Sequence, residues 1–236
     1  MLAAGVGSRI HPFSNGLPKP LVPLNGRALI SYTVDALVAN GIEEAIVVTG
    51  YRELLVREAL GEGVGLDIRF VSNARFDEGA STSLAAARRA TRGEPFLLLM
   101  SDHVFAPTLV GRLMEQAQPN GATVGADFGS HPQPYEEEAT KLDVEGERFG
   151  GRVLAIGKHL RRWQALDTGA FVCTPDVWRA FDEAAPGDEL SGVFGAMAAR
   201  GELYAGDVSG HFWFDVDTPD DLAAASAALA GGALVV

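Results

Sequence analysis

Short apolar runs rich in β-branched residues alternate with helical patterns through the first half of the chain. Runs at 45–49, 67–71 and 95–100 predict strands, and apolar periodicity predicts helices at 28–40, 53–60 and 83–91. Gly41 follows the first of these helices in a typical helix-ending position. Because strands that alternate with helices usually form a parallel sheet with crossover helices, this half predicts a doubly wound arrangement.

The pattern changes after residue 121 to extended pieces separated by polar loops rich in glycine and proline. The expected strands are 122–127, 139–144, 152–157 and 166–174. They predict antiparallel strands that are added to the sheet and cover the strand ends where a substrate would bind. Helices return at 175–184 and 190–200. A last helix is expected after Thr218, which can cap it, with Pro219 in its first turn.

The size and apolar content of the chain favour one α/β domain. It has 236 residues, of which 47% are hydrophobic, and no internal repeat or low-complexity linker divides it. We therefore expect a single-domain, Rossmann-like, doubly wound mixed sheet with an added antiparallel strand block; two small domains are the alternative.

The two ends of the chain are unusual in their first strand and in their last apolar segment. Only Met1 and Leu2 precede the small residues at 3–5, whereas strands usually run about 5 to 6 residues. Such a short first strand in the middle of a sheet should weaken the core, and we expect either that upstream residues have been lost or that the start is shorter than in related proteins. The apolar ending at 229–236 is expected to be the frayed end of a surface helix.

The charge and cysteine content narrow the classes of partner. The chain has 19 basic and 31 acidic residues and a net charge of -12, so its average field repels nucleic acid. Cys173 is the single cysteine and no Cys/His cluster has zinc spacing. No signal peptide is apparent, and the uncharged run at 222–236 is shorter than the roughly 20 apolar residues of a membrane span. A cytoplasmic protein with no nucleic-acid or membrane partner is expected.

The opening segment has the features of a polyphosphate site. It contains Gly5, Gly7 and Arg9, followed by Lys19 between two prolines. Small residues after a short strand let backbone N–H groups approach a polyphosphate, and the two cations supply positive charge. The segment is not a Walker A loop, because no Gly-Lys-Ser/Thr follows at the required spacing, and it lacks the third glycine of a dinucleotide fingerprint.

The same segment resembles the opening motif of the nucleotide-sugar pyrophosphorylases, LAAGxGxR followed by PKPL, with every fixed position occupied. Within that family the chain is most similar to the CTP:inositol-1-phosphate cytidylyltransferases. The blocks that carry this resemblance are 78–84, 100–105, 139–141, 156–160, 167–169 and 213–218. Bacterial phosphocholine cytidylyltransferases share several of these blocks. The resemblance implies the nucleotide-diphospho-sugar transferase fold, a nucleotidyltransferase activity, and CTP and a small phosphorylated alcohol as the partners. Within residues 1–236 it implies a nucleotide-binding half at 1–121 and an acceptor- and metal-binding half at 122–236. Because related domains can be fused to a membrane-bound partner enzyme, it also offers a cut fusion as the alternative interpretation of the apolar ending at 229–236.

Two acidic segments are the candidate metal site. Asp102 follows a buried strand, at the end where open α/β sheets bind ligands, and Asp215 and Asp217 lie on one face if 213–217 is a strand end. The resemblance implies Mg²⁺ held by Asp102 and by one or both of Asp215 and Asp217, because Mg²⁺ takes oxygen ligands. The competing interpretations are a turn or helix-cap role for Asp102 and a cap of the last helix for Asp217.

The resemblance also assigns residues to the nucleotide and to the acceptor. The segment 79–83 opens a helix with unpaired backbone donors that can contact a pyrimidine base, and a plain N-cap is the competing interpretation. The nucleotide-binding set is Leu2, Ala3, Ala4, Gly5, Gly7, Ser8, Arg9, Lys19, Gly79, Ser81, Ser83 and Asp102. The acceptor-binding set is Lys141, Lys158, Asp167, Thr168 and Gly169.

The expected reaction is attack by the acceptor's phosphate on the α-phosphorus of CTP, which gives CDP-inositol and pyrophosphate from CTP and inositol 1-phosphate. That phosphate is already an anion near neutral pH, so no general base is required and His103 is expected to lie behind the site or at a strand end. Arg9, Lys19 and Lys158 are the candidate catalytic cations. The alternatives are phosphocholine, a phosphonate or a sugar 1-phosphate as acceptor, a regulatory relative without catalysis, and a molybdopterin-type transferase.

Overall fold

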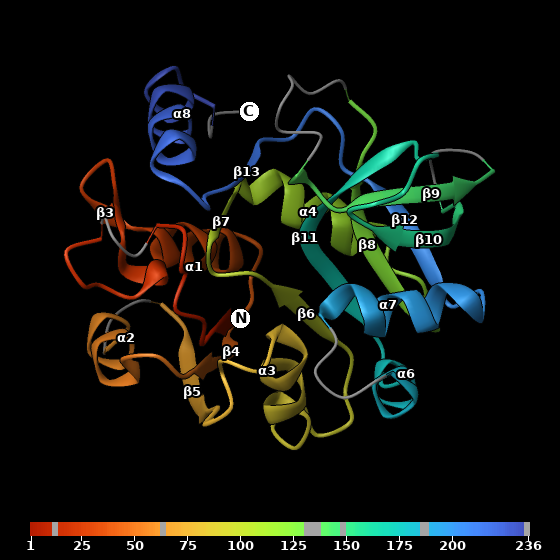
Figure 1. Ribbon diagram of the computed structural model, residues 1–236, viewed down its shortest axis with the longest axis horizontal. Helices are drawn as coiled ribbons and strands as arrows, with labels where there is room; N and C mark the ends of the chain where they lie inside the picture. Colours follow the sequence, from red (N-terminus) through yellow and green to blue (C-terminus); the bar gives the residue numbers. More distant parts are fainter. Residues whose placement is uncertain (11–13, 62–64, 130–137, 147–149, 185–188, 234–236) are drawn as a thin grey trace. The chain divides into compact units, whose positions relative to one another are not determined.

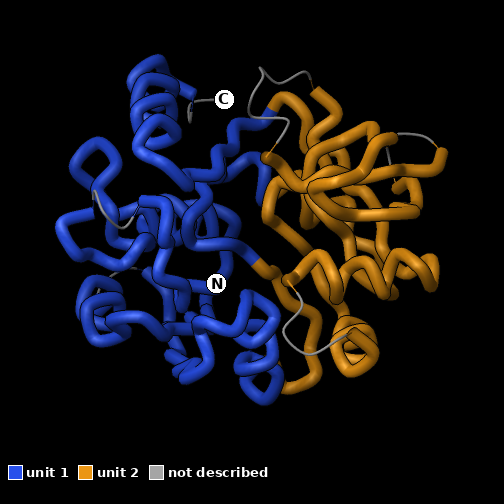
Figure 2. Tube along the Cα trace, in the orientation of Figure 1, with its two compact units in different colours: residues 1–90, 99–110, 211–236 blue, residues 91–98, 111–210 orange. Residues whose placement is uncertain are grey.

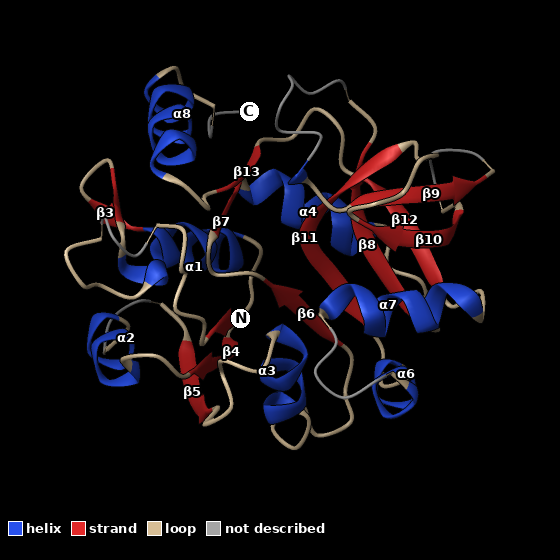
Figure 3. Ribbon diagram, in the orientation of Figure 1, coloured by secondary structure: helices blue, strands red, loops and turns tan. Residues whose placement is uncertain are grey.

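A computed structural model describes residues 1–10, 14–61, 65–129, 138–146, 150–184 and 189–233 (Figure 1). These residues form two compact units (Figure 2). Unit 1 comprises Met1–Ala90, Leu99–Val110 and His211–Val236, and unit 2 comprises Thr91–Leu98 and Gly111–Gly210. Both units contain helices and strands, so the predicted α/β class is confirmed (Figure 3). Of the apolar ending, residues 234–236 lie outside the described residues.

The first sheet of unit 1 is parallel, as the alternating pattern predicts. Its order is β1 (Leu2–Ala3), β4 (Glu44–Thr49) and β5 (Asp67–Ser72), with Leu2 opposite Val48. Helices α1 (Leu29–Ala39) and α2 (Glu53–Ala59) begin and end close to the predicted positions. Helix α3 (Ala80–Ala87) begins three residues before the predicted start, because Gly79 adopts a φ of 103° and turns the chain directly into the helix.

The first strand is only two residues long, as the sequence indicates. The amino group of Met1 donates a hydrogen bond to the carbonyl of Ile46 at 2.8 Å, which prolongs the pairing of β1 with β4. Burial lowers the pKa of this amino group to about 5. The effect of added upstream residues on the stability of the sheet stays a prediction.

A second part of unit 1 surrounds a two-stranded ribbon of β7 (His103–Phe105) and β13 (Trp213–Asp215), which pair in antiparallel fashion. Helix α8 (Pro219–Ala230) follows β13 and begins with a capping box of Thr218 and Asp221, as predicted for its start. The hairpin of β2 (Pro23–Leu24) and β3 (Arg27–Ala28) and the 3-10 turn η2 (Lys19–Leu21) complete this part. Its buried core consists of Ile10, Val22, Leu24, Leu29, Tyr32, Val104, Val216 and Ala225.

Unit 2 contains the strand block predicted for the second half. The sheet order is β6 (Phe96–Leu99), β11 (Ala165–Cys173), β8 (Ala122–Asp127), β12 (Leu203–Asp207), β10 (Arg152–Gly157) and β9 (Lys141–Glu145). The predicted strands β8, β9, β10 and β11 pair with one another in antiparallel fashion as expected, whereas β12 pairs with β8 in parallel. The strand predicted at 95–100 was expected in the parallel sheet, but as β6 it pairs with β11 of this sheet. Helices α6 (Val177–Glu183) and α7 (Leu190–Ala199) pack against each other, and Phe194 of α7 stacks on Phe171 of β11.

Several elements were not predicted from the pattern. They are η2, the hairpin of β2 and β3, β7, α4 (Pro107–Glu115) and β12. The compact units also follow bounds other than the predicted functional halves, because His211–Val236 belongs to unit 1. The assignment of binding roles to 1–121 and 122–236 stays a prediction. Among the described residues, no helix is long and apolar enough to cross a lipid bilayer.

Candidate active site

The ribbon of β7 and β13 brings together acidic residues that lie more than a hundred positions apart. Asp102 immediately precedes β7, and Asp215 is the last residue of β13, directly opposite His103. The backbone N–H of Val216 donates to the carbonyl of Asp102 at 3.1 Å, which fixes the two chain segments side by side. On the other side, the backbone N–H of Ser101 donates a hydrogen bond to the carbonyl of Leu2 in β1 at 3.2 Å. The acidic group therefore lies next to the opening loop.

Lys19 lies among the carboxylates of this acidic group. Its Nζ donates to Asp102 Oδ2 at 2.7 Å and to Asp217 Oδ1 at 2.6 Å, and it lies 3.8 Å from Asp215 Oδ1. Only 6% of the lysine side chain is exposed. Pro18 and Pro20 on either side restrict the backbone of η2, so the sequence Pro-Lys-Pro holds the buried lysine in place.

The charges of this cluster shift one another's pKa values. Burial alone would lower the pKa of Lys19, but the carboxylates of Asp102, Asp215 and Asp217 outweigh it and raise the pKa above its usual range. Burial would likewise raise the pKa of Asp102, yet the charges of Lys19 and His103 and their hydrogen bonds hold it well below its usual range. Lys19 and Asp102 are therefore both ionised at neutral pH.

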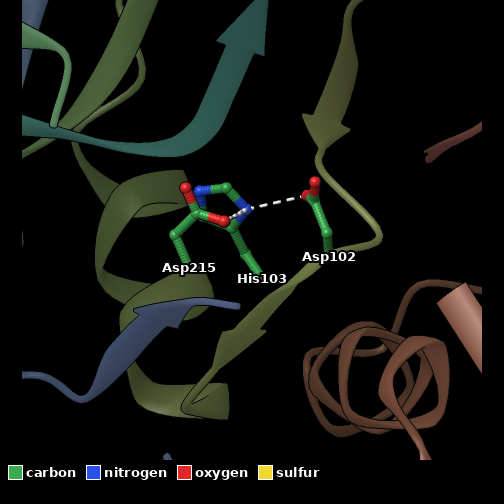
Figure 4. A group of neighbouring side chains, drawn as sticks. All are labelled: Asp102, His103 and Asp215. Atoms are coloured by element: carbon green, nitrogen blue, oxygen red, sulfur yellow. Dashed lines mark hydrogen bonds and ion pairs between the residues drawn. The ribbon is translucent and has the colours of Figure 1, made fainter. Parts of the chain in front are cut away.

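His103, which was expected behind the site or at a strand end, begins β7 and contacts the cluster. Its Nδ1 lies 2.9 Å from Asp102 Oδ1 and 3.7 Å from Asp215 Oδ1 (Figure 4). The ring stacks on Phe105 and on Trp213, with ring centroids 5.7 and 6.4 Å apart, and these contacts restrict its plane. Burial lowers its pKa, but Asp215 and Asp102 outweigh burial and raise it to about 9. The position of His103 directly after Asp102 is the sequence signal that could have revealed it.

Asp215 is the least satisfied member of the group. Its Oδ1 is buried and has no hydrogen-bond partner among the described residues, and burial, followed by its neighbouring carboxylates, raises its pKa. Ligand atoms of Asp102, His103 and Asp215 all lie within 4.8 Å of one another. A buried oxygen without a partner beside a second carboxylate is the donor set that a hard divalent cation requires. The carboxylates of Asp102 and Asp215 therefore fit a metal ion.

Asp217 does not cap the last helix in this structure. Thr218 and Asp221 form the cap, and Asp221 Oδ2 also accepts a hydrogen bond from the N–H of Asp217. The carboxylate of Asp217 instead contacts Lys19 through Oδ1 and Arg9 through Oδ2. The cap interpretation of Asp217 is therefore wrong, and its carboxylate belongs to the acidic group. Its role towards a metal stays a prediction.

The packing of the opening loop requires a glycine at position 7. Leu2, Ala3 and Ala4 are buried at the strand end, whereas Gly5, Ser8 and Arg9 are exposed. Gly7 has a φ of +68°, and a Cβ at this position would lie 2.6 Å from the Cβ of Lys19. Gly7 thus leaves the room in which the lysine's alkyl chain packs. Around Gly5 a Cβ would meet nothing within 4 Å.

The start of α3 is organised by a buried asparagine that the sequence analysis did not identify. Asn73 Nδ2 donates to Thr82 Oγ1 at 2.9 Å and to Ser83 Oγ at 3.0 Å. Gly79 precedes the helix, and Ser81 and Ser83 are buried in its first turn. No side chain caps this helix, so the plain N-cap interpretation has no support in the hydrogen bonds. The predicted base-binding segment is therefore held in one conformation by Asn73.

The predicted acceptor residues all lie in unit 2 and have different environments. Lys141 is buried, and its Nζ donates to the carbonyls of Ala139 and Lys158 at 3.3 and 3.0 Å. Lys158 itself is exposed at the end of β10. In β11, Thr168 donates to the carbonyl of Gly125, while Asp167 accepts a hydrogen bond from the N–H of Gly169. Lys141 thus supports the backbone that presents Lys158.

Comparisons with known proteins agree with these features. The profile of the MobA-like NTP transferase domain family matches residues 1–139. The chain is 37% identical over 233 residues to a bifunctional IPC transferase and DIPP synthase of Rubrobacter xylanophilus, covering 94% of this chain and 49% of that protein. It is 30% identical over 240 residues to the CMP-5'-(3-aminopropyl)phosphonate synthase of Streptomyces rubellomurinus, covering 94% of this chain and 37% of that protein. The chain therefore spans half or less of the length of these two relatives.

A solved structure is similar over nearly the whole chain. The inositol-1-phosphate CTP transferase from T. maritima superimposes with a TM-score of 0.81 at 25% identity, covering 93% of this chain and 89% of that one. The similarity extends through both compact units and past the 139 residues that the family profile matches. It confirms the resemblance that the opening motif and the later sequence blocks indicate.

Proposed function

The chain belongs to the MobA-like NTP transferase domain family, a family of nucleotidyltransferases, and on that basis we propose that it transfers CMP from CTP to inositol 1-phosphate. The observation that carries the reaction class is the cluster of Asp102, Asp215 and Asp217 around Lys19 beside the opening loop. The choice of CTP and inositol 1-phosphate rests on the relatives and on the motif blocks of the second half.

The proposed reaction forms one bond and breaks one. An ionised oxygen of the acceptor's phosphate attacks the α-phosphorus of CTP, and the bond from that phosphorus to the oxygen leading to the β-phosphorus breaks. Pyrophosphate leaves with the electron pair, and CDP-inositol remains. Since several anionic groups must meet, the protein contributes positioning and positive charge rather than a base. Arg9 of the opening loop and Lys19 beside it, which both contact Asp217, supply this positive charge.

Mg²⁺ is the proposed cofactor, and Asp102 with Asp215 and Asp217 are the residues that would hold it. A magnesium ion there supplies charge neutralisation and orientation of the triphosphate. The charge of Lys19 and the hydrogen bond from His103 keep Asp102 ionised, and the orphaned Oδ1 of Asp215 offers an oxygen without a hydrogen-bond donor. The chain's own residues thus provide oxygen ligands and fix their orientation.

Two further segments complete the proposed substrate contacts. The first turn of α3, which Asn73 anchors, offers backbone donors and the hydroxyl groups of Ser81 and Ser83 to the cytosine. Lys158 orients the acceptor's phosphate, and Lys141 acts on it through the backbone of residue 158. This refines the sequence-based proposal, in which both lysines contact the phosphate.

A phosphonate acceptor is the second candidate, and the similarity to the CMP-5'-(3-aminopropyl)phosphonate synthase is the observation that favours it. A panel of four nucleoside triphosphates against inositol 1-phosphate, an aminoalkyl phosphonate, phosphocholine and a sugar 1-phosphate separates these possibilities. Pyrophosphate release is the readout. We expect the highest kcat/KM for CTP with inositol 1-phosphate. A higher value for another pair would replace the proposed substrates, and no release with any pair would contradict catalysis.

The metal assignment has a direct test in Asp102→Asn. This substitution keeps the size of the side chain but removes the charge that pairs with Lys19 and would bind the cation. We expect the turnover number to fall by at least about a hundredfold, the size of loss seen when an electrostatic catalytic group is removed. Circular dichroism should show an intact fold. Near-normal turnover would exclude Asp102 from the metal site.

A further inference from the structure

Lys19 occupies the centre of the proposed metal site. Each carboxylate oxygen of Asp102 and Asp217 already has a cationic neighbour: Lys19 and His103 for Asp102, and Lys19 and Arg9 for Asp217. Only Asp215 retains a buried oxygen without a hydrogen-bond partner. Asp215 has Lys19 and His103 only at 3.8 and 3.7 Å, so a divalent ion that approaches this arrangement alone finds one carboxylate without a hydrogen-bonded cation, and it must displace a cation to reach a second carboxylate.

We propose that Lys19 is an exchangeable internal counter-ion, which blocks divalent-metal binding in the free protein and moves to the triphosphate when nucleotide and metal bind together. This inference rests on the proposed function, since it concerns the regulation of the same site. In the free protein Lys19 neutralises the carboxylates; in the loaded protein the metal does so. Metal affinity is then low until a triphosphate is present.

The geometry shows why Lys19 and a metal compete. The ammonium lies 2.7 and 2.6 Å from oxygens of Asp102 and Asp217, at hydrogen-bond distance. Mg²⁺ binds carboxylate oxygens at about 2.0–2.1 Å and requires lone pairs directed at it. The same lone pairs serve the ammonium. Because Lys19 is almost wholly buried, its departure also leaves three neighbouring carboxylates with only His103 and Arg9 as cationic neighbours unless the metal replaces it.

The opening loop provides the route by which a triphosphate would release Lys19. The alkyl chain of Lys19 packs against Gly7, and Arg9 of the same loop contacts the same carboxylate as Lys19. A polyphosphate on this loop offers new anionic oxygens to both cations. Since coupling between two ligands is reciprocal, the triphosphate raises the affinity for metal by the same factor by which metal raises the affinity for triphosphate.

The test measures Mn²⁺ binding to the free protein by electron paramagnetic resonance, without nucleotide. We compare the wild type with Lys19→Met, and we use Lys158→Met as a control, because Lys158 is an exposed lysine of unit 2 that loses the same charge. Lys19→Met should bind Mn²⁺ at least about tenfold more tightly than wild type, equivalent to about 1.4 kcal/mol. Lys158→Met should match wild type. An equal or weaker affinity in Lys19→Met would overturn the inference.

The outcomes separate this inference from the proposed function. If wild type and Lys19→Met bind Mn²⁺ equally well, the counter-ion role is wrong while the metal site stands. If neither protein binds Mn²⁺, with or without CTP, both the inference and the proposed metal site are wrong. Pyrophosphate release by the wild type with CTP and inositol 1-phosphate tests the proposed function independently of both results.

A measurement on the wild type covers the case in which Lys19→Met does not fold. The chain has three lysines, Lys19, Lys141 and Lys158, so ¹³C-lysine labelling gives three side-chain signals to follow by NMR. Mg²⁺ together with CTP should shift the Lys19 signal, whereas the same concentration of Mg²⁺ alone should leave it unchanged. A Lys19 signal that stays in place with Mg²⁺ and CTP would contradict the proposed exchange.

Discussion

Gly7→Ala tests the link between the opening loop and Lys19. Gly7 has a φ of +68°, and a Cβ there would lie 2.6 Å from the Cβ of Lys19 and 2.9 Å from its Cδ. Such contacts are too short, so either the loop or the lysine must move. Because Lys19 contacts Asp102 and Asp217 through a buried ammonium, its movement alters the site as well as the loop.

The size of the effect follows from two contributions. The left-handed backbone costs a residue with a Cβ about 1–2 kcal/mol, which in a protein of this size lowers Tm by roughly 2 to 8 °C. An ordinary carbon contact is about 3.5–4.0 Å, so Lys19 or the loop must shift by about 1 Å. A displacement of about 1 Å at a catalytic group costs on the order of a hundredfold in rate. We therefore expect a modest loss of stability and a large loss of turnover.

The assay pairs thermal unfolding with pyrophosphate release and uses Gly5→Ala as the matched control. Gly5 lies in the same loop, has no positive φ, and leaves open space for a Cβ. Gly5→Ala should therefore leave Tm unchanged, whereas Gly7→Ala should lower both Tm and kcat. If both variants lose turnover equally with no change in Tm, the glycines are needed for contact with the substrate and not for the packing of Lys19. That result would refute this reasoning.

Three other substitutions test separate parts of the account. Lys158→Ala should raise the KM of the acceptor and leave that of CTP unchanged; the reverse would refute its role. His103→Ala should lower kcat/KM about 10- to 100-fold by removing a charge-assisted hydrogen bond to Asp102, and His103→Asn, which keeps a donor, should lose less; equal losses would contradict this. Asp176 precedes α6, and its carboxylate accepts hydrogen bonds from the N–H of Gly121 and the hydroxyl of Thr174. Asp176→Ala should therefore lower the free energy of unfolding by about 1–2 kcal/mol at neutral pH and leave kcat intact; an unchanged Tm would contradict it.

The effect of Asp176→Ala should also depend on pH in a defined direction. The hydrogen bond from the N–H of Gly121, and then that from Thr174, hold the pKa of Asp176 below its ordinary value. Its contribution is therefore fully present above the unfolded pKa of about 3.9 and is lost as the pH falls through the lower folded pKa. The difference in Tm between wild type and variant should shrink below about pH 4. A difference that grows as the pH falls would contradict this assignment.

Elements with strong local signals could be predicted from the sequence. The strand Ala122–Asp127 was predicted with its exact bounds, and the last helix begins at the predicted cap. Both depend on residues that are neighbours in the chain: an apolar run in one case, and Thr218 with Pro219 in the other. The motif at the N-terminus, LAAGxGxR followed by PKPL, likewise indicated the reaction class, because every fixed position of it is occupied in this sequence.

Features that depend on long-range pairing could not be predicted. Nothing local indicates that His103 lies opposite Asp215, because the pairing of β7 with β13 joins segments of only three residues each. The same applies to Gly7, which the sequence analysis assigned to phosphate approach and which in the structure accommodates Lys19. Asn73 was missed because its partners, Thr82 and Ser83, lie across a turn that the residue pattern does not define.

The central claim is the transfer of CMP to a phosphate acceptor, and ³¹P NMR of a mixture of the protein, CTP, inositol 1-phosphate and Mg²⁺ tests it most directly. We predict that the signals of CTP and of the phosphate monoester decline together. Pyrophosphate and a new diphosphate diester should appear in equal amounts, and Asp102→Asn should form neither. An unchanged monoester signal, or release of inorganic phosphate in place of pyrophosphate, would contradict the account.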